Sequence, residues 1–342
     1  MSEPKFLLSK TKVLEQYNKV KQLASFISYS SKTNQEVTKI LDDETNCFFS
    51  VHLINELKHL KDNSRVIFLA QGWTNNSIKK LIKQGIKYFI VDNEPDLETL
   101  MNYLEKNKNQ INLFLRLKLK EHTLKTERYF VFGMDSETIN KKLKELKNHS
   151  QIKNLGIHFH RKTQNMSEWN LKDEIASTIE KENLEAIDIM NIGGGLPADY
   201  ANTNVEIIKS IFNKIKEFKE WLEKYNIKLV IEPGRFIAAP SCRLKTNIIN
   251  IYKQNIVINA SIYNSDIDAL IVPVKLLVEN ERKQGIPYVI KGITPCSMDL
   301  FRYRVYLDNP QIGDEIIFLN AGAYNFSTDF CDLEKIDTKI LT

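Results

Sequence analysis

The chain has 342 residues, of which 42% are hydrophobic and 27% are charged, a composition typical of a globular protein with one large domain or two smaller ones. Its 48 basic and 43 acidic residues are mixed along the chain, so the sequence lacks the clustered basic face that nucleic-acid binding requires. It has neither the apolar segment of a signal peptide nor an apolar run long enough to span a bilayer. We therefore expect a cytoplasmic protein that binds neither nucleic acid nor a membrane.

The cysteines are far apart in the sequence, with no CxxC pair and no histidine nearby at the spacing of metal ligands. They are Cys47, Cys242, Cys296 and Cys331. We expect reduced thiols and no metal site.

Short β-rich apolar runs alternate with longer amphipathic stretches through roughly the first 240 residues. The runs predict strands at Ser25–Tyr29, Cys47–Val51, Val66–Ala70, Tyr88–Val91, Leu113–Leu117, Leu155–Phe159, Ala186–Ile189 and Leu229–Ile231. The stretches between them predict helices at Asn34–Leu41, Asn55–Lys61, Ser77–Gln84, Leu97–Lys106, Ser136–Leu146 and Val205–Lys224. This alternation favours a (β/α)8 barrel, although a doubly wound sheet fits it almost as well.

The pattern changes after Pro240, where strand-like segments follow one another with few helical windows between them. These strands are predicted at Thr246–Ile251, Ile256–Ser261, Leu270–Pro273, Tyr288–Ile293 and Glu315–Asn320. The change predicts a second, mostly β domain.

Residues that could catalyse a reaction or bind a ligand follow several of the predicted barrel strands. The active sites of such barrels lie at these strand ends. Lys32 follows SFISY, His160 ends GIHFH, Gly193–Gly195 follow IDIMNI, and Glu232 and Arg235 follow KLVI. Each has a simpler interpretation: a solvated lysine, a core histidine, a tight turn and a surface ion pair. Together they supply an amine for a Schiff base, a flat ring, a phosphate cradle and a carboxylate, which are the parts of a pyridoxal phosphate site.

Motifs around these residues resemble those of the fold-type III pyridoxal-phosphate decarboxylases, a family that includes ornithine, arginine and diaminopimelate decarboxylases. SYSSKTN resembles Y-A-V-K-A-N, which implies that Lys32 is the Schiff-base lysine. GIHFHRKTQ resembles F-H-V-G-S, so that His160 would stack on the cofactor ring and Thr163 would meet the phosphate. NAGAYNF resembles E-N-A-G-A-Y, which implies that Tyr324 contacts phosphate or substrate.

Two further motifs complete the resemblance. NIGGGLP is similar to D-I-G-G-G-F-P, which implies that Gly193, Gly194 and Gly195 wrap the phosphate. IEPGRF is similar to E-P-G-R, which implies that Glu232 pairs with the pyridine nitrogen and that Arg235 approaches the phosphate. The order and spacing of these motifs are a stronger signal than any one of them alone.

The resemblance implies a TIM-like barrel at residues 10–240, of the alanine-racemase type, followed by a mostly β C-terminal domain at residues 241–342. The first strand, Lys5–Leu8 within residues 1–9, would join this second domain. It also implies a head-to-tail homodimer with active sites at the subunit interface, and an amino-acid substrate.

The segment GITPCSMD at 292–299 departs from the family pattern G-P-x-C-[DE]-x-x-D. Without a gap Cys296 falls on the acidic position and Pro295 on the cysteine, whereas with a one-residue gap Cys296 is the family cysteine. We interpret Cys296 as a catalytic residue that helps to protonate the product from the partner chain, with a merely buried thiol as the alternative. Asp299 is a candidate substrate-binding residue of the same segment.

NSDIDAL at 264–270 departs from the pattern in a way that bears on the substrate. Diaminopimelate decarboxylases have an arginine in a string such as N-P-R-P-A-L-Y, where this chain has Ile267 between Asp266 and Asp268. Isoleucine cannot pair with a distal carboxylate, and two aspartates would attract a distal amine or guanidinium. Solvated turn residues are the alternative interpretation of both aspartates.

FFSVHLINEL at 48–57 resembles F-D-V-A-S-x-x-E-L, with Ser50 in place of the aspartate and His52 in place of the alanine. His52, like His158, is interpreted as a core residue. The resulting prediction is a decarboxylase of a basic amino acid (ornithine, lysine or arginine) in polyamine biosynthesis. The alternatives are a carboxynorspermidine-type or diaminopimelate decarboxylase and, from another class, a non-catalytic regulator that binds a decarboxylase or its regulator.

Overall fold

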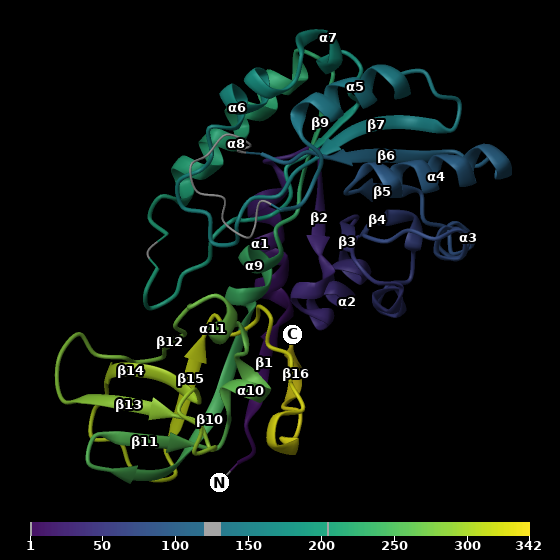
Figure 1. The fold of residues 1–342 in the computed structure, drawn as a ribbon. Helices are drawn as coiled ribbons and strands as arrows, with labels where there is room; N and C mark the ends of the chain where they lie inside the picture. Colours follow the sequence, from purple (N-terminus) through teal and green to yellow (C-terminus); the bar gives the residue numbers. More distant parts are fainter. Residues whose placement is uncertain (1, 120–130, 204) are drawn as a thin grey trace. The chain divides into compact units, whose positions relative to one another are not determined.

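A computed structural model describes residues 2–119, 131–203 and 205–342, which divide into two compact units (Figure 1). One unit comprises Asn18–Pro197 and Ile207–Pro233 and is called the barrel unit below. The other, the sheet unit, comprises Met1–Tyr17, Ala198–Glu206 and Gly234–Thr342. Within the described residues, no helix combines the length and the apolar character that crossing a bilayer would require.

Eight parallel strands of the barrel unit form a closed barrel in chain order. They are β2 (Phe26–Ser30), β3 (Phe48–Val51), β4 (Val66–Ala70), β5 (Tyr88–Val91), β6 (Ile111–Arg116), β7 (Ile152–His158), β8 (Ile189–Asn191) and β9 (Lys228–Ile231). The barrel closes where Phe26 and Ile27 pair with Val230 and Ile231. The barrel prediction is therefore confirmed and the doubly wound sheet is excluded, although β8 begins at the last residue of its predicted segment.

Helices connect the strands, as the amphipathic stretches predicted. They are α2 (Gln35–Glu44), α3 (Asn75–Lys83), α4 (Glu94–Asn107), α5 (Ser136–Leu146), α6 (Leu171–Thr178), α7 (Lys181–Leu184) and α8 (Ile208–Glu223), and α1 (Lys10–Lys21) precedes β2. Asn34 and Asn93 accept backbone N–H groups at the starts of α2 and α4, which explains why both helices begin there. The predicted helix Asn55–Lys61 is instead a 3-10 segment, Ile54–His59.

Apolar side chains from five strands meet in one buried cluster: Ile67, Ile90, Phe114, Ile189 and Val230. They come from β4, β5, β6, β8 and β9. Since branched and aromatic side chains fill this part of the barrel, the polar groups that follow the strands are left at its carboxyl end.

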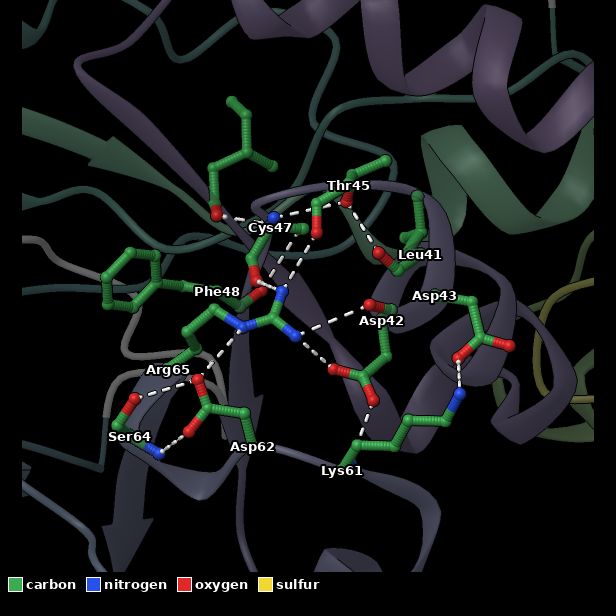
Figure 2. Close-up of polar contacts among 11 residues, drawn as sticks. Leu41, Asp42, Asp43, Thr45, Cys47, Phe48, Lys61, Asp62, Ser64 and Arg65 are labelled. Carbon is green, nitrogen blue, oxygen red and sulfur yellow. Dashed lines mark hydrogen bonds and ion pairs between the residues drawn. The ribbon is translucent and has the colours of Figure 1, made fainter.

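The amino end of the barrel is tied together by Arg65, which immediately precedes β4 (Figure 2). Its Nη1 donates to the carbonyl oxygens of Thr45 and Cys47, each at 3.0 Å, and its Nη2 binds the carboxylate of Asp42. The second carboxylate oxygen of Asp42 accepts the N–H of Lys61 at 2.8 Å. One guanidinium thus joins the end of α2 to the starts of β3 and β4.

The sheet unit is built on one eight-stranded sheet. Its strands are β1 (Lys5–Ser9), β10 (Cys242–Tyr252), β11 (Asn255–Ile258), β12 (Leu277–Val278), β13 (Pro287–Lys291), β14 (Leu300–Tyr306), β15 (Glu315–Leu319) and β16 (Asp337–Leu341). β1 pairs antiparallel with β10 and parallel with β16, so the first strand of the chain lies in this sheet.

One predicted strand of the sheet unit is wrong. The segment Leu270–Pro273 begins inside α11 (Asp268–Ile271), a short helix that follows α10 (Ile262–Ser265). The apolar run Leu270–Val272 satisfies a strand pattern, but Asp266 and Asp268 before it are buried and the chain turns into helix there. A run of three apolar residues does not distinguish the two states.

Candidate active site

Lys32 lies just beyond the carboxyl end of β2, in the 3-10 turn Ser31–Thr33. Its side chain is exposed, whereas Ser31 and Thr33 on either side are buried and hold the turn in place. Among the described residues, no hydrogen bond or ion pair engages the Lys32 amine. The amine is therefore free to react with a carbonyl group, as the chemistry of a Schiff base requires.

The glycine loop after β8 folds against the segment after β7. The N–H of Gly194 donates to Nδ1 of His160 at 3.1 Å, which leaves the ring proton of a neutral imidazole on Nε2. Gly193 and Gly195 have φ angles of +64° and +100°, and a Cβ on Gly194 would lie 2.6 Å from the carbonyl oxygen of Glu232. No larger residue fits this loop without moving its neighbours.

The same loop offers a free backbone donor. The N–H of Gly193 binds Asn191 and that of Gly194 binds His160, but the N–H of Gly195 has no partner within residues 2–119, 131–203 and 205–342. Gly195 is partly exposed, so this donor can reach an anion. The loop fits a phosphate group at this donor.

Glu232 directly follows β9, and it is buried with 8% of its surface exposed. Its Oε1 accepts a hydrogen bond from Nδ2 of Asn191 at 2.8 Å, and its Oε2 lies 3.9 Å from Nε2 of His158. Burial by itself would raise the pKa of Glu232, but His158, Asn191 and Ser50 together hold the pKa below its usual value. Glu232 is therefore an ionised carboxylate inside the barrel.

Two histidines interpreted as core residues lie at this end of the barrel as well. Both ring nitrogens of His158 and Nδ1 of His52 are buried without a hydrogen-bond partner in the described part of the chain. Burial, and then the charge of Lys32, lower the pKa of His52 to about 4, and burial also lowers the pKa of His158. Both rings are neutral near pH 7, and orphaned polar atoms of this kind suit a site that receives a polar ligand.

Asn191 is a site residue that sequence reasoning missed. It ends β8, donates to Glu232 and accepts the N–H of Gly193 at 2.9 Å, so it joins the carboxylate to the glycine loop. The sequence did contain a feature that could have identified it: Asn191 occupies the first position of the NIGGGLP motif, where the family pattern has aspartate.

In the sheet unit, Arg235 lies in α9 (Gly234–Ala238) and is buried. Its guanidinium makes a two-pronged ion pair with Asp268 and donates to the hydroxyl of Tyr200 at 2.9 Å. It also lies 5.2 Å from the centre of the Tyr324 ring. Although burial would lower the pKa of Arg235, the bond to Asp268 raises it overall, so the ion pair is maintained.

Asp266 differs from its neighbour Asp268. It is 5% exposed, and no hydrogen bond to its carboxyl group is found in the described part of the chain. Burial, and then the charge of Asp268, raise the pKa of Asp266 well above its usual value. The two predicted substrate-binding aspartates therefore have different environments: Asp268 is fixed by Arg235, whereas the Asp266 carboxyl group has no hydrogen-bond partner among the described residues.

Cys296 and Asp299 lie in the turn between β13 and β14. The Tyr263 hydroxyl lies 3.3 Å from the Cys296 sulfur, and this contact lowers the thiol's pKa. The Asp299 carboxylate accepts N–H groups from Ile262 at 2.8 Å and Thr294 at 3.0 Å, and the Thr294 hydroxyl at 2.7 Å. Asp299 thus shapes this turn, and its substrate contact stays a prediction, as do those of Cys296 and of the partly buried Thr163.

Comparison with known proteins decides the family. Residues 10–239 match the family described as "Pyridoxal-dependent decarboxylase, pyridoxal binding domain". The chain belongs to this family. Pyridoxal phosphate is accordingly its cofactor and decarboxylation of an amino acid its reaction, and the free Lys32 amine and the glycine loop fit that cofactor.

Relatives and solved structures agree with this assignment. The diaminopimelate decarboxylase of Campylobacter jejuni is 24% identical, over 89% of this chain and 80% of that protein. The lysine/ornithine decarboxylase of Vibrio vulnificus, solved with putrescine, has a TM-score of 0.83 at 22% identity over 99% of this chain and 94% of that one. The Helicobacter pylori diaminopimelate decarboxylase, solved with L-lysine, has a TM-score of 0.82 at 18% identity over 100% and 92%.

Proposed function

We propose that this decarboxylase acts on a basic amino acid, namely ornithine, lysine or arginine, and supplies a polyamine pathway. The observation that carries the proposal is the state of Asp266, a buried carboxyl group without a hydrogen-bond partner in the described residues. A buried carboxyl group is stabilised as an anion by a nearby cation, and the distal ammonium or guanidinium of a basic substrate is such a cation. A second carboxylate on the substrate would be repelled there.

Asp268 is less suited to this role, because its two oxygens already bind Arg235. We propose that Asp268 orients Arg235, and that Arg235 and Tyr324 contribute to phosphate binding. The 5.2 Å contact between the guanidinium and the Tyr324 ring supports treating the two as one group.

When bound, pyridoxal phosphate supplies an electron sink for the charge that develops as the carboxylate leaves the substrate. In our proposal, Lys32 holds the cofactor covalently, Glu232 keeps a proton on its ring nitrogen, and His160 supports the ring face. The free N–H of Gly195, with Gly193, Gly194 and Thr163, binds the phosphate. The low pKa of Glu232 supports this role, since a carboxylate that stays ionised favours the protonated form of the ring nitrogen.

We propose Cys296 as the acid that protonates the product, supplied by the partner chain of a cytoplasmic homodimer. The Tyr263 hydroxyl lies 3.3 Å from its sulfur and lowers the thiol's pKa, which makes Cys296 a stronger proton donor than an ordinary thiol. Size-exclusion chromatography with light scattering tests the dimer, and mixing Lys32→Ala with Cys296→Ala protein tests whether two chains share a site. Shared sites predict partial recovery of activity in the mixture, and independent sites predict none.

The second candidate is diaminopimelate decarboxylase, since relatives of that name cover most of this chain. Against it stands the sequence NSDIDAL, which has no arginine for a distal carboxylate. A carboxynorspermidine-type substrate, which carries amines, remains compatible with Asp266.

The deciding experiment measures carbon dioxide release from purified protein with pyridoxal phosphate. Ornithine, lysine, arginine, diaminopimelate and carboxynorspermidine are offered in parallel, with Lys32→Ala as the control. Release from a basic amino acid that is lost in the variant supports the proposal, and release from diaminopimelate alone contradicts it. Cofactor binding without release from any substrate would favour the non-catalytic regulator.

A further inference from the structure

Asn191 makes two hydrogen bonds of opposite sense inside the barrel. Its Nδ2 donates to Oε1 of Glu232 at 2.8 Å, and its Oδ1 accepts the N–H of Gly193 at 2.9 Å. The N–H of Glu232 in turn donates to the carbonyl oxygen of Gly193 at 2.7 Å. These three bonds form a closed ring between the end of β8, the glycine loop and the residue after β9.

An amide suits this position while Glu232 is charged, because it donates to the carboxylate and accepts from Gly193 at the same time. An ionised aspartate accepts hydrogen bonds but cannot donate, so it would face Glu232 with a second negative charge. The similar family motif, D-I-G-G-G-F-P, has aspartate where this chain has Asn191.

Ser50 at the end of β3 shows the same change. It replaces the aspartate of the F-D-V-A-S pattern, its hydroxyl lies 2.7 Å from that of Ser28, and it helps to keep the pKa of Glu232 low. Two positions that are acidic in the family motifs are thus occupied here by neutral groups that can donate to Glu232.

The remaining groups around Glu232 do not replace the missing acids. His158 lies at 3.9 Å, the charge of Glu232 also acts on His52 and His160, and Arg116 is within electrostatic range. Arg116 is itself paired with Asp92 at 2.7 Å. Glu232 is thus the carboxylate that Asn191 binds directly and whose pKa Ser50 helps to lower.

We propose that Asn191 is a positioning residue that fixes the Glu232 carboxylate for the cofactor's ring nitrogen and holds the glycine loop for the phosphate, and that Ser50 assists it as a neutral group in β3. The inference rests on the proposed pairing of Glu232 with that nitrogen. In this arrangement, an amide and a hydroxyl, which can donate hydrogen bonds, occupy two positions that are aspartates in the family motifs.

The test compares Asn191→Asp with Asn191→Ala by titrating apoprotein with pyridoxal phosphate between pH 5.5 and pH 8.5. Near pH 8 we expect both variants to bind about 10-fold more weakly than wild type, because each loses the donor to Glu232. Toward pH 5.5 the Asn191→Asp variant should approach wild-type affinity, since a protonated aspartate donates as the amide does. Asn191→Ala should not recover.

Three additions keep the test decisive. Ser50→Asp should show the same pH-dependent recovery, and Asn154→Asp, in β7 beside Asn112, controls for adding a carboxylate elsewhere in the barrel. The pH dependence of the bound cofactor's visible absorbance reports its protonation without any substrate. Equal and pH-independent losses in Asn191→Asp and Asn191→Ala, or wild-type affinity in both, would overturn the proposal. Since no turnover is measured, a wrong substrate assignment leaves the result intact.

Discussion

The two ends of the barrel differ in whether their polar groups have partners within the fold. At the amino end, Arg65 is bound by two carbonyl oxygens and the carboxylate of Asp42, so its donors are used within the fold (Figure 2). At the carboxyl end, the Lys32 amine and both ring nitrogens of His158 have no hydrogen-bond partners in the described residues. The difference shows that one end is completed by folding, whereas the other keeps polar groups available for a ligand.

The largest effect should come from removing the free amine. Lys32→Ala is expected to lower decarboxylation by at least about 1000-fold and to abolish the visible band of lysine-bound cofactor. Because the amine has no partner in the described structure, the apoprotein should keep its stability. Lys39→Ala, which removes an exposed ion pair with Glu36 in α2, is the control that should keep both activity and band. Normal turnover in Lys32→Ala would refute its assignment as the Schiff-base lysine.

Removing the arginine at the opposite end should instead affect stability. Arg65→Ala leaves the buried carboxylate of Asp42 without its cation, and we expect a loss of about 3 kcal/mol in the free energy of unfolding by urea. Arg282→Ala removes a solvent-exposed pair with Asp308 and should cost less than about 1 kcal/mol. If the two variants lose equal stability, the amino end does not have the role described above.

A third substitution separates recognition from chemistry. Asp266→Asn should raise KM for a basic substrate by about 10-fold and change kcat less, because it removes charge from the substrate contact alone. Cofactor affinity should be unchanged. Asp268→Asn, by contrast, frees Arg235 and is expected to weaken cofactor binding. An unchanged KM in Asp266→Asn would remove the argument for a basic substrate.

The smallest effect concerns pH. His52 has a folded-state pKa of about 4 against an ordinary value of 6.5, so between these values the unfolded chain binds a proton that the folded chain does not. Stability contributed by neutral His52 is present above pH 6.5 and is lost as the pH falls toward 4. His52→Gln should flatten the decline of apoprotein stability in this window. His149→Gln, next to Glu105 at the surface, provides the matched control.

Periodicity predicted most of the barrel, because each buried strand is a compact apolar run bounded by polar helix. It failed where tertiary contacts decide the structure. Leu270–Pro273 enters a short helix, and β14 was not predicted because its sequence LFRYRVY carries arginines, one of which, Arg302, is buried by pairing with Glu281. β16 was missed since every residue in it is exposed.

The site was predictable to the extent that motifs mark it. Lys32, His160 and Glu232 follow barrel strands as expected, with His160 held by Gly194. The role of Asn191 becomes visible only from the hydrogen bonds of its amide. No sequence pattern reveals that Arg235 forms an ion pair with Asp268 and not with Asp266. Such partner choices depend on contacts between residues far apart in the chain.

The pairing of β1 also sets an order of events during synthesis. Lys5–Ser9 lies between β10 and β16, and its parallel partner, Asp337–Leu341, is synthesised only after all the strands of the barrel. All the strands of the barrel have been synthesised once translation reaches residue 231. The barrel can therefore fold while translation continues, but β1 cannot complete its pairing until β16 has been made.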